Sequence, residues 1–427
     1  MKKNYFNINV QFNSLLFLCT ALLVFFTSSV KSQESDKFIE YKGLVISKGS
    51  NNPLPFVNLV VEGTNIATVT NSEGNFSLKI DESLPSAKVT FTYPGYQKLI
   101  IIMADLSDEN SVISLSPQTY ELDEINISRP KNALYLVQQV FDNIDKNYAD
   151  QDNFMTAFYR ETINKRNRSA SLAEAVVTIQ KKPYASYETD LISIYKARKS
   201  TNYDRLDTVA IKLQGGPLNA LYADLVKYPK YFITPQSLSN YDFSFGEPLI
   251  NDGSMVYVVN FKQKSTINEP LYYGKLFIDA QSNALTNAIY NLNVEDRNAA
   301  AALFVKKKPN RVKVYPTEIS YRIDYRNKDG KWYYSYSNVQ LEFIVNWKRK
   351  LFNSKYRISS EMLITDWETE LMSDGIDRKS KFKQNAVLAD EVSGFADPEF
   401  WGAYNVIEPE KSIQQAIDKI QTQIKRD

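Results

Sequence analysis

The sequence predicts a mainly β protein with two domains. These are a small N-terminal sandwich of seven strands over residues 38–128 and an α+β domain of long antiparallel hairpins with a few helices over residues 130–427. Seven short alternating runs between Tyr41 and Leu115, separated by turn residues at regular spacing, predict the sandwich. Longer alternating runs beyond residue 150, joined at Asn- or Asp-containing turns, predict the hairpins. Aromatic residues make up 13% of the chain, led by 28 tyrosines, which suit half-buried strand faces.

Residues 1–32 have the composition of a secretory signal peptide. Lys2 and Lys3 precede an apolar run over residues 15–26, which has the length of a signal core and is short for a membrane span. Val30-Lys31-Ser32 fits a cleavage site before Gln33, and an uncleaved N-terminal anchor is the alternative. We therefore expect an exported protein with no transmembrane helix after signal removal.

The chain has no histidine, and its one cysteine, Cys19, lies inside the apolar core of the expected signal. This composition excludes a Ser-His-Asp triad, a Cys-His pair and the usual catalytic zinc sites. Carboxylate pairs, Lys, Tyr, Ser-Lys pairs and oxygen-ligand metals remain available. We expect no cofactor. Removing residues 1–32 leaves a net charge of −1, which gives no support for nucleic-acid binding.

Alternation along the sandwich predicts strands with one packed face and one solvated face. Phe76, Leu78 and Ile80 alternate with polar residues at 75, 77 and 79, and the run over residues 88–93 behaves in the same way. The sequence Asn-Ser-Glu-Gly at 71–74 predicts a turn between two strands, with Gly74 adopting a positive φ.

These residues give the N-terminal part a family resemblance. It resembles the carboxypeptidase regulatory-like domain, a transthyretin-like seven-stranded sandwich. The matching residues are Gly63, Thr64, Thr70, Gly74, Phe76, Leu78, Val89, Phe91, Gly95 and Tyr96. Residues 120–128 are similar to the segment that often closes this module in envelope proteins of Gram-negative bacteria. The resemblance implies a fold and a compartment, the periplasm or the outer-membrane periphery. It does not imply peptidase activity, because the zinc domain of carboxypeptidases needs histidine ligands.

The second domain begins after Arg129-Pro130, which interrupts the strand pattern. Asn132 is the expected N-cap of an amphipathic helix, and Pro217 is expected in the first turn of a second, short helix. Hairpins are expected to turn at 251–253, near 281–283 and at Asp329-Gly330, with strands of about ten residues. Pro409 is expected to open a C-terminal helix with an apolar stripe over residues 413–424.

Two further resemblances concern this second domain. The runs at 157–161, 172–177 and 400–410 resemble the C-terminal region of uncharacterised envelope proteins. A helix followed by long hairpins also resembles, by topology alone, the half-barrel of lipoprotein carriers. In a half-barrel, strands between residues 254 and 345 would line a concave face that holds an apolar ligand. A sheet with both faces filled by side chains would remove that hypothesis.

Four residues are candidates for contact with a ligand or a partner surface. Arg160 and Glu161 would clamp a polar ligand, or would simply alternate between the two faces of a strand. Trp401 and Tyr404 would cover a ligand groove, or would anchor a returning C-terminal segment to the core.

Other polar residues have functional and structural interpretations. Asp279, Glu295 and Asp296 would supply carboxylates for glycoside hydrolysis, or would be ordinary strand-end acids. Asn71, Glu73 and Asp81 would hold calcium, although turn chemistry accounts for them better. Two basic runs, over 306–313 and 348–357, would meet lipid phosphates or form solvated hairpin ends.

The sequence therefore predicts a non-catalytic exported envelope protein with a binding or scaffolding role. Its expected partner is an unknown envelope protein or an apolar or glycan ligand, with association to the outer membrane and without nucleic acid. One alternative is a carboxylate-dependent hydrolase. The other is a periplasmic accessory to a TonB-dependent transporter, since such receptors often begin with the same sandwich.

Overall fold

The fold is described from a computed structural model. It covers residues 37–84, 86–107, 110–118, 130–166, 168–201, 214–251, 253–305, 308, 310–348, 351–368, 375–377, 379–392, 400–411 and 413. The expected signal peptide, the segment 120–128 and most of the predicted C-terminal helix lie outside these residues. Phe38–Asp427 belong to one compact unit. In the described ranges, no helix combines the length and apolarity needed to cross a membrane.

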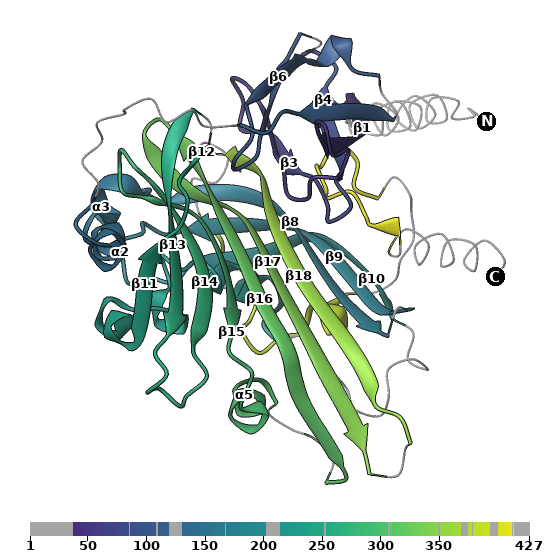
Figure 1. Ribbon diagram of the computed structural model, residues 1–427. Helices are drawn as coiled ribbons and strands as arrows, with labels where there is room; N and C mark the ends of the chain where they lie inside the picture. Colours follow the sequence, from purple (N-terminus) through teal and green to yellow (C-terminus); the bar gives the residue numbers. More distant parts are fainter. Residues whose placement is uncertain are drawn as a thin grey trace, which may run out of the picture. The chain divides into compact units, whose positions relative to one another are not determined.

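Seven strands form the N-terminal sandwich, as predicted (Figure 1). They are β1 (Phe38–Ser47), β2 (Asn58–Val61), β3 (Ala67–Val69), β4 (Asn75–Asp81), β5 (Lys88–Thr92), β6 (Leu99–Ile102) and β7 (Ser111–Leu115), with the 3-10 helix η2 (Met103–Asp105) between the last two. One sheet has the order β4-β1-β7 and the other β3-β2-β5-β6. Phe76, Leu78 and Phe91 lie in the shared core, and Gly74 has the expected positive φ, +81°.

The prediction that one face of β4 is solvated is wrong. Ser77 is 1% exposed and Lys79 is 9% exposed, so both faces of this strand are covered. The backbone amide of Lys79 donates to Asn405 Oδ1 at 2.7 Å, and Asn405 Nδ2 donates back to the carbonyl of Lys79 at 3.0 Å. Alternation within β4 could not reveal a cover that comes from a segment more than 300 residues later.

An antiparallel sheet of 11 strands dominates the rest of the chain (Figure 1). Its order is β10-β9-β8-β18-β17-β16-β15-β14-β13-β11, with β12 also paired to β13. The strands are β8 (Asn153–Lys165), β9 (Arg168–Lys181), β10 (Leu191–Thr201), β11 (Tyr241–Phe245), β12 (Leu249–Asn251), β13 (Ser254–Gln263), β14 (Tyr272–Asp279), β15 (Leu285–Leu292), β16 (Val312–Lys328), β17 (Lys331–Trp347) and β18 (Ser354–Glu368).

Both helices that the sequence predicts before residue 230 are present in the structure. They are α2 (Ala133–Asp142), α3 (Ile144–Asn147), α4 (Gly216–Tyr222), α5 (Arg297–Phe304) and α6 (Leu388–Glu391), with 3-10 helices η3 (Pro229–Tyr231) and η4 (Pro235–Asn240). Asn132 caps α2, and its Oδ1 accepts from the amide of Tyr135 at 2.7 Å. Pro217 lies in the first turn of α4, also as predicted.

The hairpin turns lie where the sequence places them, but the central strands are longer than expected. β16 and β17 each have 17 residues and pair across the turn at Asp329-Gly330, where both residues have positive φ. Register shifts between Pro316 and Glu318 and between Asp324 and Tyr325 interrupt their pairing. A bulge changes the phase of the alternation, and the sequence pattern therefore underestimates the strand length.

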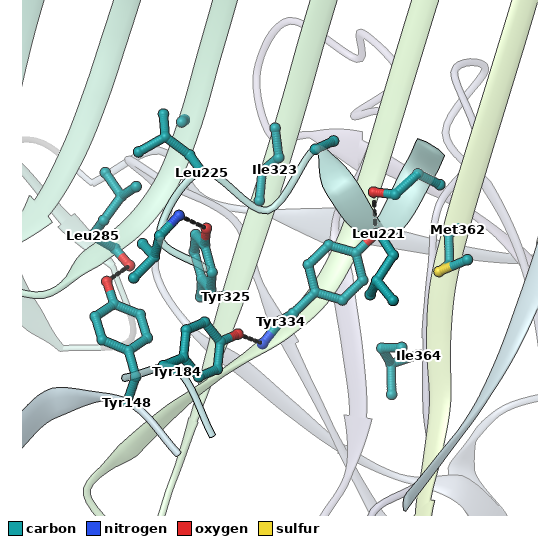
Figure 2. Close-up of a cluster of buried hydrophobic side chains, with 14 of the residues drawn as sticks. Tyr148, Tyr184, Leu221, Leu225, Leu285, Ile323, Tyr325, Tyr334, Met362 and Ile364 are labelled. Atoms are coloured by element: carbon teal, nitrogen blue, oxygen red, sulfur yellow. Dashed lines mark hydrogen bonds between the residues drawn. The ribbon is translucent and has the colours of Figure 1, made fainter. Parts of the chain in front are cut away.

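One face of the large sheet is filled by side chains. Residues from β13 to β18 on this face pack with α2, α4 and the loops after α4. Figure 2 shows part of this core, where Leu221 and Leu225 lie near Ile323 and Tyr334 of the sheet. A gap beside Val140, Leu225 and Leu285 has a volume of only about 10 Å³. That volume is near the minimum for one water molecule, so this gap does not hold a lipid chain.

Candidate functional site

Arg160 lies at the centre of a buried charge cluster on the face of the sheet opposite that core. Its Nε lies 2.7 Å from Glu174 Oε1, and its Nη1 lies 3.2 Å from Glu361 Oε1. Arg198 reaches the other oxygen of Glu174, also at 2.7 Å. The three neighbouring strands β8, β9 and β10 thus place an Arg-Glu-Arg row in register. Burial raises the pKa of Glu174, but the two guanidinium groups outweigh it and hold that pKa below its ordinary value.

Trp401 and its neighbours, the segment 400–411, cover this cluster. The Trp401 ring meets Phe158 edge-on at 5.5 Å, and the Arg198 guanidinium lies over Trp401 at 4.8 Å. Arg160 Nη2 donates to the carbonyl of Ile407 at 2.8 Å. Tyr404 contacts Tyr195 at 5.3 Å between ring centres. Arg160 and Trp401 are 3% and 5% exposed, so the contacts that they make are internal ones.

The same segment joins the sandwich to the large sheet. Besides the Asn405 contacts with β4, Asn71 Nδ2 donates to the carbonyl of Glu408 at 3.1 Å. The amide of Lys411 donates to Glu73 Oε2 at 3.3 Å. The turn at 71–74 therefore does more than reverse the chain, because its side chains bind a segment that also covers Arg160.

Glu161 is separated from the other three candidates, since it points to the opposite face of β8. Tyr159 donates its hydroxyl to Glu161 Oε2 at 2.9 Å. Burial, followed by the nearby charge of Asp390, raises the pKa of Glu161 from 4.5 to about 7. The structure therefore does not combine Arg160 and Glu161 into one clamp. The two side chains alternate between the two faces of β8, as in the other interpretation of this pair.

Lys181 is the centre of a second buried charge cluster, which the sequence analysis missed. Its Nζ lies 2.9 Å from Asp190 Oδ2 and 2.8 Å from Asp224 Oδ2, and the side chains of all three are at most 1% exposed. Tyrosine rings surround it, with those of Tyr184, Tyr228 and Tyr334 centred 4.8–5.8 Å from the ammonium group. The signal in the sequence was an apolar row ending in a lysine, Ala175, Val177, Ile179 and Lys181.

Several of these tyrosines also hold the surrounding backbone, as Figure 2 shows. Tyr148 donates its hydroxyl to the carbonyl of Leu285 at 3.0 Å, and the hydroxyl of Tyr184 accepts from the amide of Tyr334 at 2.9 Å. Tyr325 donates to Asp224 Oδ1 at 2.7 Å. Burial raises the pKa of Tyr325 well above its ordinary value, so it stays a neutral donor. The Lys181 cluster is fully enclosed in the core, with its charges paired to one another.

A polar cleft lies at the end of the sheet formed by β11, β13 and the loop before β14. Its volume is about 460 Å³. The lining includes the cross-strand partners Asp242 and Lys262, and acids and amides from the following loops. Twelve residues line it: Asp242, Lys262, Gln263, Lys264, Ser265, Ile267, Asn268, Glu269, Pro270, Asn293, Glu295 and Asp296. Unlike the two charge clusters, this cleft is open.

The three acids considered for hydrolysis do not meet. Glu295 and Asp296 line the cleft, where Asp296 Oδ1 also caps α5 by accepting from Asn298 and Ala299. Asp279 lies at the opposite end of β14 and accepts from the amide of Ser282 at 2.7 Å in a turn. Seven residues of strand separate its end of β14 from the cleft end, roughly 23 Å at the ordinary rise per residue.

Metal ligation finds no support in the described ranges. They contain no group of three or more acidic, cysteine or histidine side chains that could hold an ion. The residues suggested for calcium act as turn residues, since Asn71 Oδ1 accepts from the amides of Glu73 and Asn75 at 2.9 and 3.0 Å.

Comparison with protein families identifies the sandwich. Residues 41–127 match the family model of the CarboxypepD_reg-like domain, so the expected domain is confirmed for this part of the chain. No curated protein matches the sequence.

Solved structures give weak similarities only. A LolA superfamily protein from Nitrosomonas europaea aligns at 8% identity over 56% of this chain and 95% of its own, with a TM-score of 0.22. A DUF1329 family protein from Desulfovibrio piger aligns at 11% identity over 58% of this chain and 99% of its own, with a TM-score of 0.22. A putative membrane-associated protein of unknown function from Bacteroides fragilis aligns at 10% identity over 77% of this chain and 98% of its own, with a TM-score of 0.15. Similarities with such TM-scores carry no argument about this protein.

Proposed function

We propose that the protein is an exported, non-catalytic binding protein of the bacterial cell envelope, and that its ligand is a hydrophilic molecule such as a glycan. The class of ligand is inferred from the contrast in volume and lining between a polar cleft and an apolar gap. The cleft beside Asp242 and Lys262 has about 460 Å³ and a polar lining, whereas the apolar gap in the core has about 10 Å³. Export follows from the signal-like segment at 1–32, and the envelope from the resemblance of the sandwich.

The cleft offers groups suited to sugar hydroxyls. Carboxylates accept hydrogen bonds and amides both donate and accept, so Asp242, Asn268 and Asn293 supply the orienting contacts that a polar ligand needs. The loop that carries Asn268 is held in place by Gln263. Its Nε2 donates to the carbonyls of Ile267 and Glu269, and its Oε1 accepts from the amide of Leu271 at 2.8 Å. A fixed loop loses little conformational entropy on binding.

The absence of histidine, and of cysteine outside the expected signal, supports a binding role. Without histidine, and with Cys19 inside the expected signal, the exported chain lacks imidazole and thiol chemistry. The buried charges at Arg160 and Lys181 are paired internally and have no open route to a substrate.

Calorimetric titration with neutral oligosaccharides tests the proposal, with chitotetraose and maltotetraose as probes. We expect one of them to bind the chain from Gln33 onward, and the double variant Asp242→Ala/Asn268→Ala to lower the affinity at least tenfold. Asp105→Ala, an exposed acid of the sandwich, is the matched control and should leave binding unchanged. Binding that is equal in all three proteins, or no binding of either probe, would contradict the assignment of the cleft.

A hydrolase remains the second candidate, because four carboxylates line the cleft, those of Asp242, Glu269, Glu295 and Asp296. Analysis of the titration mixtures for shorter oligosaccharides distinguishes the two. Product that disappears in Glu295→Gln would establish catalysis and overturn the non-catalytic assignment.

A further inference from the structure

Three connections that are far apart in the sequence meet at one end of the large sheet. The register pairs Lys165 of β8 with Tyr356 of β18, and the amide of Arg166 donates to the carbonyl of Lys355 at 2.8 Å. Val312 of β16 pairs with Trp347 of β17, and the amide of Lys348 donates to the carbonyl of Arg311 at 3.2 Å. The β8–β9 turn, the start of β16 and the β17–β18 turn therefore form one surface, here named the basic tip.

The described charged side chains within these three connections are all cationic. They are Lys165, Arg166, Arg168, Lys308, Arg311, Lys313, Lys348, Lys355 and Arg357. Glu342 pairs with Lys355 at 2.7 Å and with Arg357 at 3.4 Å, and Glu318 lies opposite Glu342 further along the strands. Among described residues, no ion pair is found for Arg166, Arg168, Arg311, Lys313 or Lys348.

Two large apolar side chains stand at this cationic end. Leu351 is 97% exposed and Phe352 is 76% exposed, in the turn between β17 and β18. A third, Leu303, is 58% exposed on α5, which packs on β16. A two-strand turn ordinarily uses Gly, Asn or Asp, so the turn geometry does not require Leu and Phe here.

We propose that the basic tip docks on an anionic phospholipid bilayer, with Leu351 and Phe352 entering the headgroup region while the surrounding Lys and Arg side chains contact lipid phosphates. Charge complementarity selects this occupant, because an anionic surface matches a cluster of described cations and an interfacial depth of a few ångströms accommodates two exposed apolar side chains. The docking assumes the export proposed above, and it uses residues separate from the polar cleft.

Vesicle co-sedimentation tests the docking, using the chain from Gln33 onward, which retains the whole compact unit. Vesicles of phosphatidylcholine alone are compared with vesicles containing 30 mol% phosphatidylglycerol, a composition chosen at about the anionic content of natural membranes. We expect binding to the anionic vesicles that weakens as salt is raised. The double variant Arg166→Gln/Lys313→Gln should lower the partition coefficient about 30-fold, at the usual contribution of each cation near such a surface.

The apolar part of the contact has its own variant and controls. Leu351→Ser/Phe352→Ser should lower the partition coefficient at least tenfold on anionic vesicles, since it removes the side chains that enter the interface. Tyr187→Ser changes a side chain that is 104% exposed at the other end of β9, and Lys379→Gln/Lys383→Gln changes two exposed lysines near the start of β10. Both controls should bind like the unaltered protein.

Three outcomes would overturn the docking. One is equal binding of the tip variants and the controls. Another is equal binding to neutral and anionic vesicles at low salt. The third is binding to heparin with none to anionic vesicles, which would show that the tip recognises a soluble polyanion instead. Oligosaccharide titration of the tip variants separates this proposal from the cleft, because a tip that fails on vesicles leaves sugar binding at its original affinity.

Discussion

Replacing Glu161 by Gln should stabilise the protein at neutral and alkaline pH. Glu161 is 5% exposed, and burial raises its pKa from 4.5 to about 7. A carboxyl group with a higher pKa in the folded state binds its proton more tightly there than in the unfolded chain. Its favourable contribution is fully present below about pH 4.5, and the free energy of unfolding then falls as the pH rises through 7. The difference between the two pKa values corresponds to about 3 kcal/mol.

The variant Glu161→Gln is neutral and has nearly the shape of the protonated acid, so Tyr159 keeps an oxygen acceptor. The variant should match the unaltered protein at pH 4.5 and exceed it by about 3 kcal/mol at pH 8. For a compact unit of this size that difference corresponds to a rise in melting temperature of about 4 °C. Scanning calorimetry at pH 4.5, 6 and 8 measures it, and Glu318→Gln, an exposed acid on β16, is the matched control.

The comparison of variants at each pH isolates Glu161, because other buried acids such as Glu361 and Glu408 contribute equally to both proteins. A melting difference that is the same at all three pH values would refute the reasoning. So would a variant that is less stable at pH 8, since it would mean that the ionised carboxylate is the form that the fold prefers.

Four further substitutions, the last of them a comparison for the third, test other parts of the structure by urea unfolding. Lys181→Met leaves two buried carboxylates unpaired and should cost about 3–5 kcal/mol; a loss below 1 kcal/mol would contradict the pairing. Asn405→Ala removes both hydrogen bonds to the Lys79 backbone and should lower the free energy of unfolding by about 2–4 kcal/mol. No loss of stability would contradict the attachment of the segment 400–411 to β4. Gly274→Ala places a Cβ 2.2 Å from a backbone oxygen of β15 and should cost at least about 2 kcal/mol, whereas Gly330→Ala enters open space and should cost only about 1 kcal/mol. Equal losses for the two glycine variants would contradict the packing of β14 on β15.

Local features of this fold could be predicted because their causes lie within a few residues. Asn132 precedes an amphipathic run and caps α2, and the positive φ values at Asp329 and Gly330 follow from turn-forming residues. The sandwich likewise follows from alternation and turn spacing. The length of β16 escaped prediction, because bulges shift the alternation partway along the strand.

The candidate site depended on contacts that no local pattern contains. Arg160 could be placed on one face of β8, but its partners Glu174 and Glu361 come from strands on either side, 14 and 201 residues away. The cover over β4 comes from Asn405, whose role required the tertiary fold. The Lys181 cluster was missed although the sequence holds a signal for it, because a lysine that ends the apolar row of Ala175, Val177 and Ile179 indicates a buried charge that needs acidic partners.

The position of β18 constrains the order in which the large sheet can assemble. This last strand lies between β17 and β8, and its register brings Glu361 opposite Arg160. Strands β8 to β10 therefore cannot join the rest of the sheet until residues 354–368 have been synthesised. Pairings between strands so far apart in the sequence form slowly, so the edges of the two halves of the sheet stay unpaired until β18 joins them. Folding of the large sheet is consequently completed from the C-terminal side of the chain, once β18 is available.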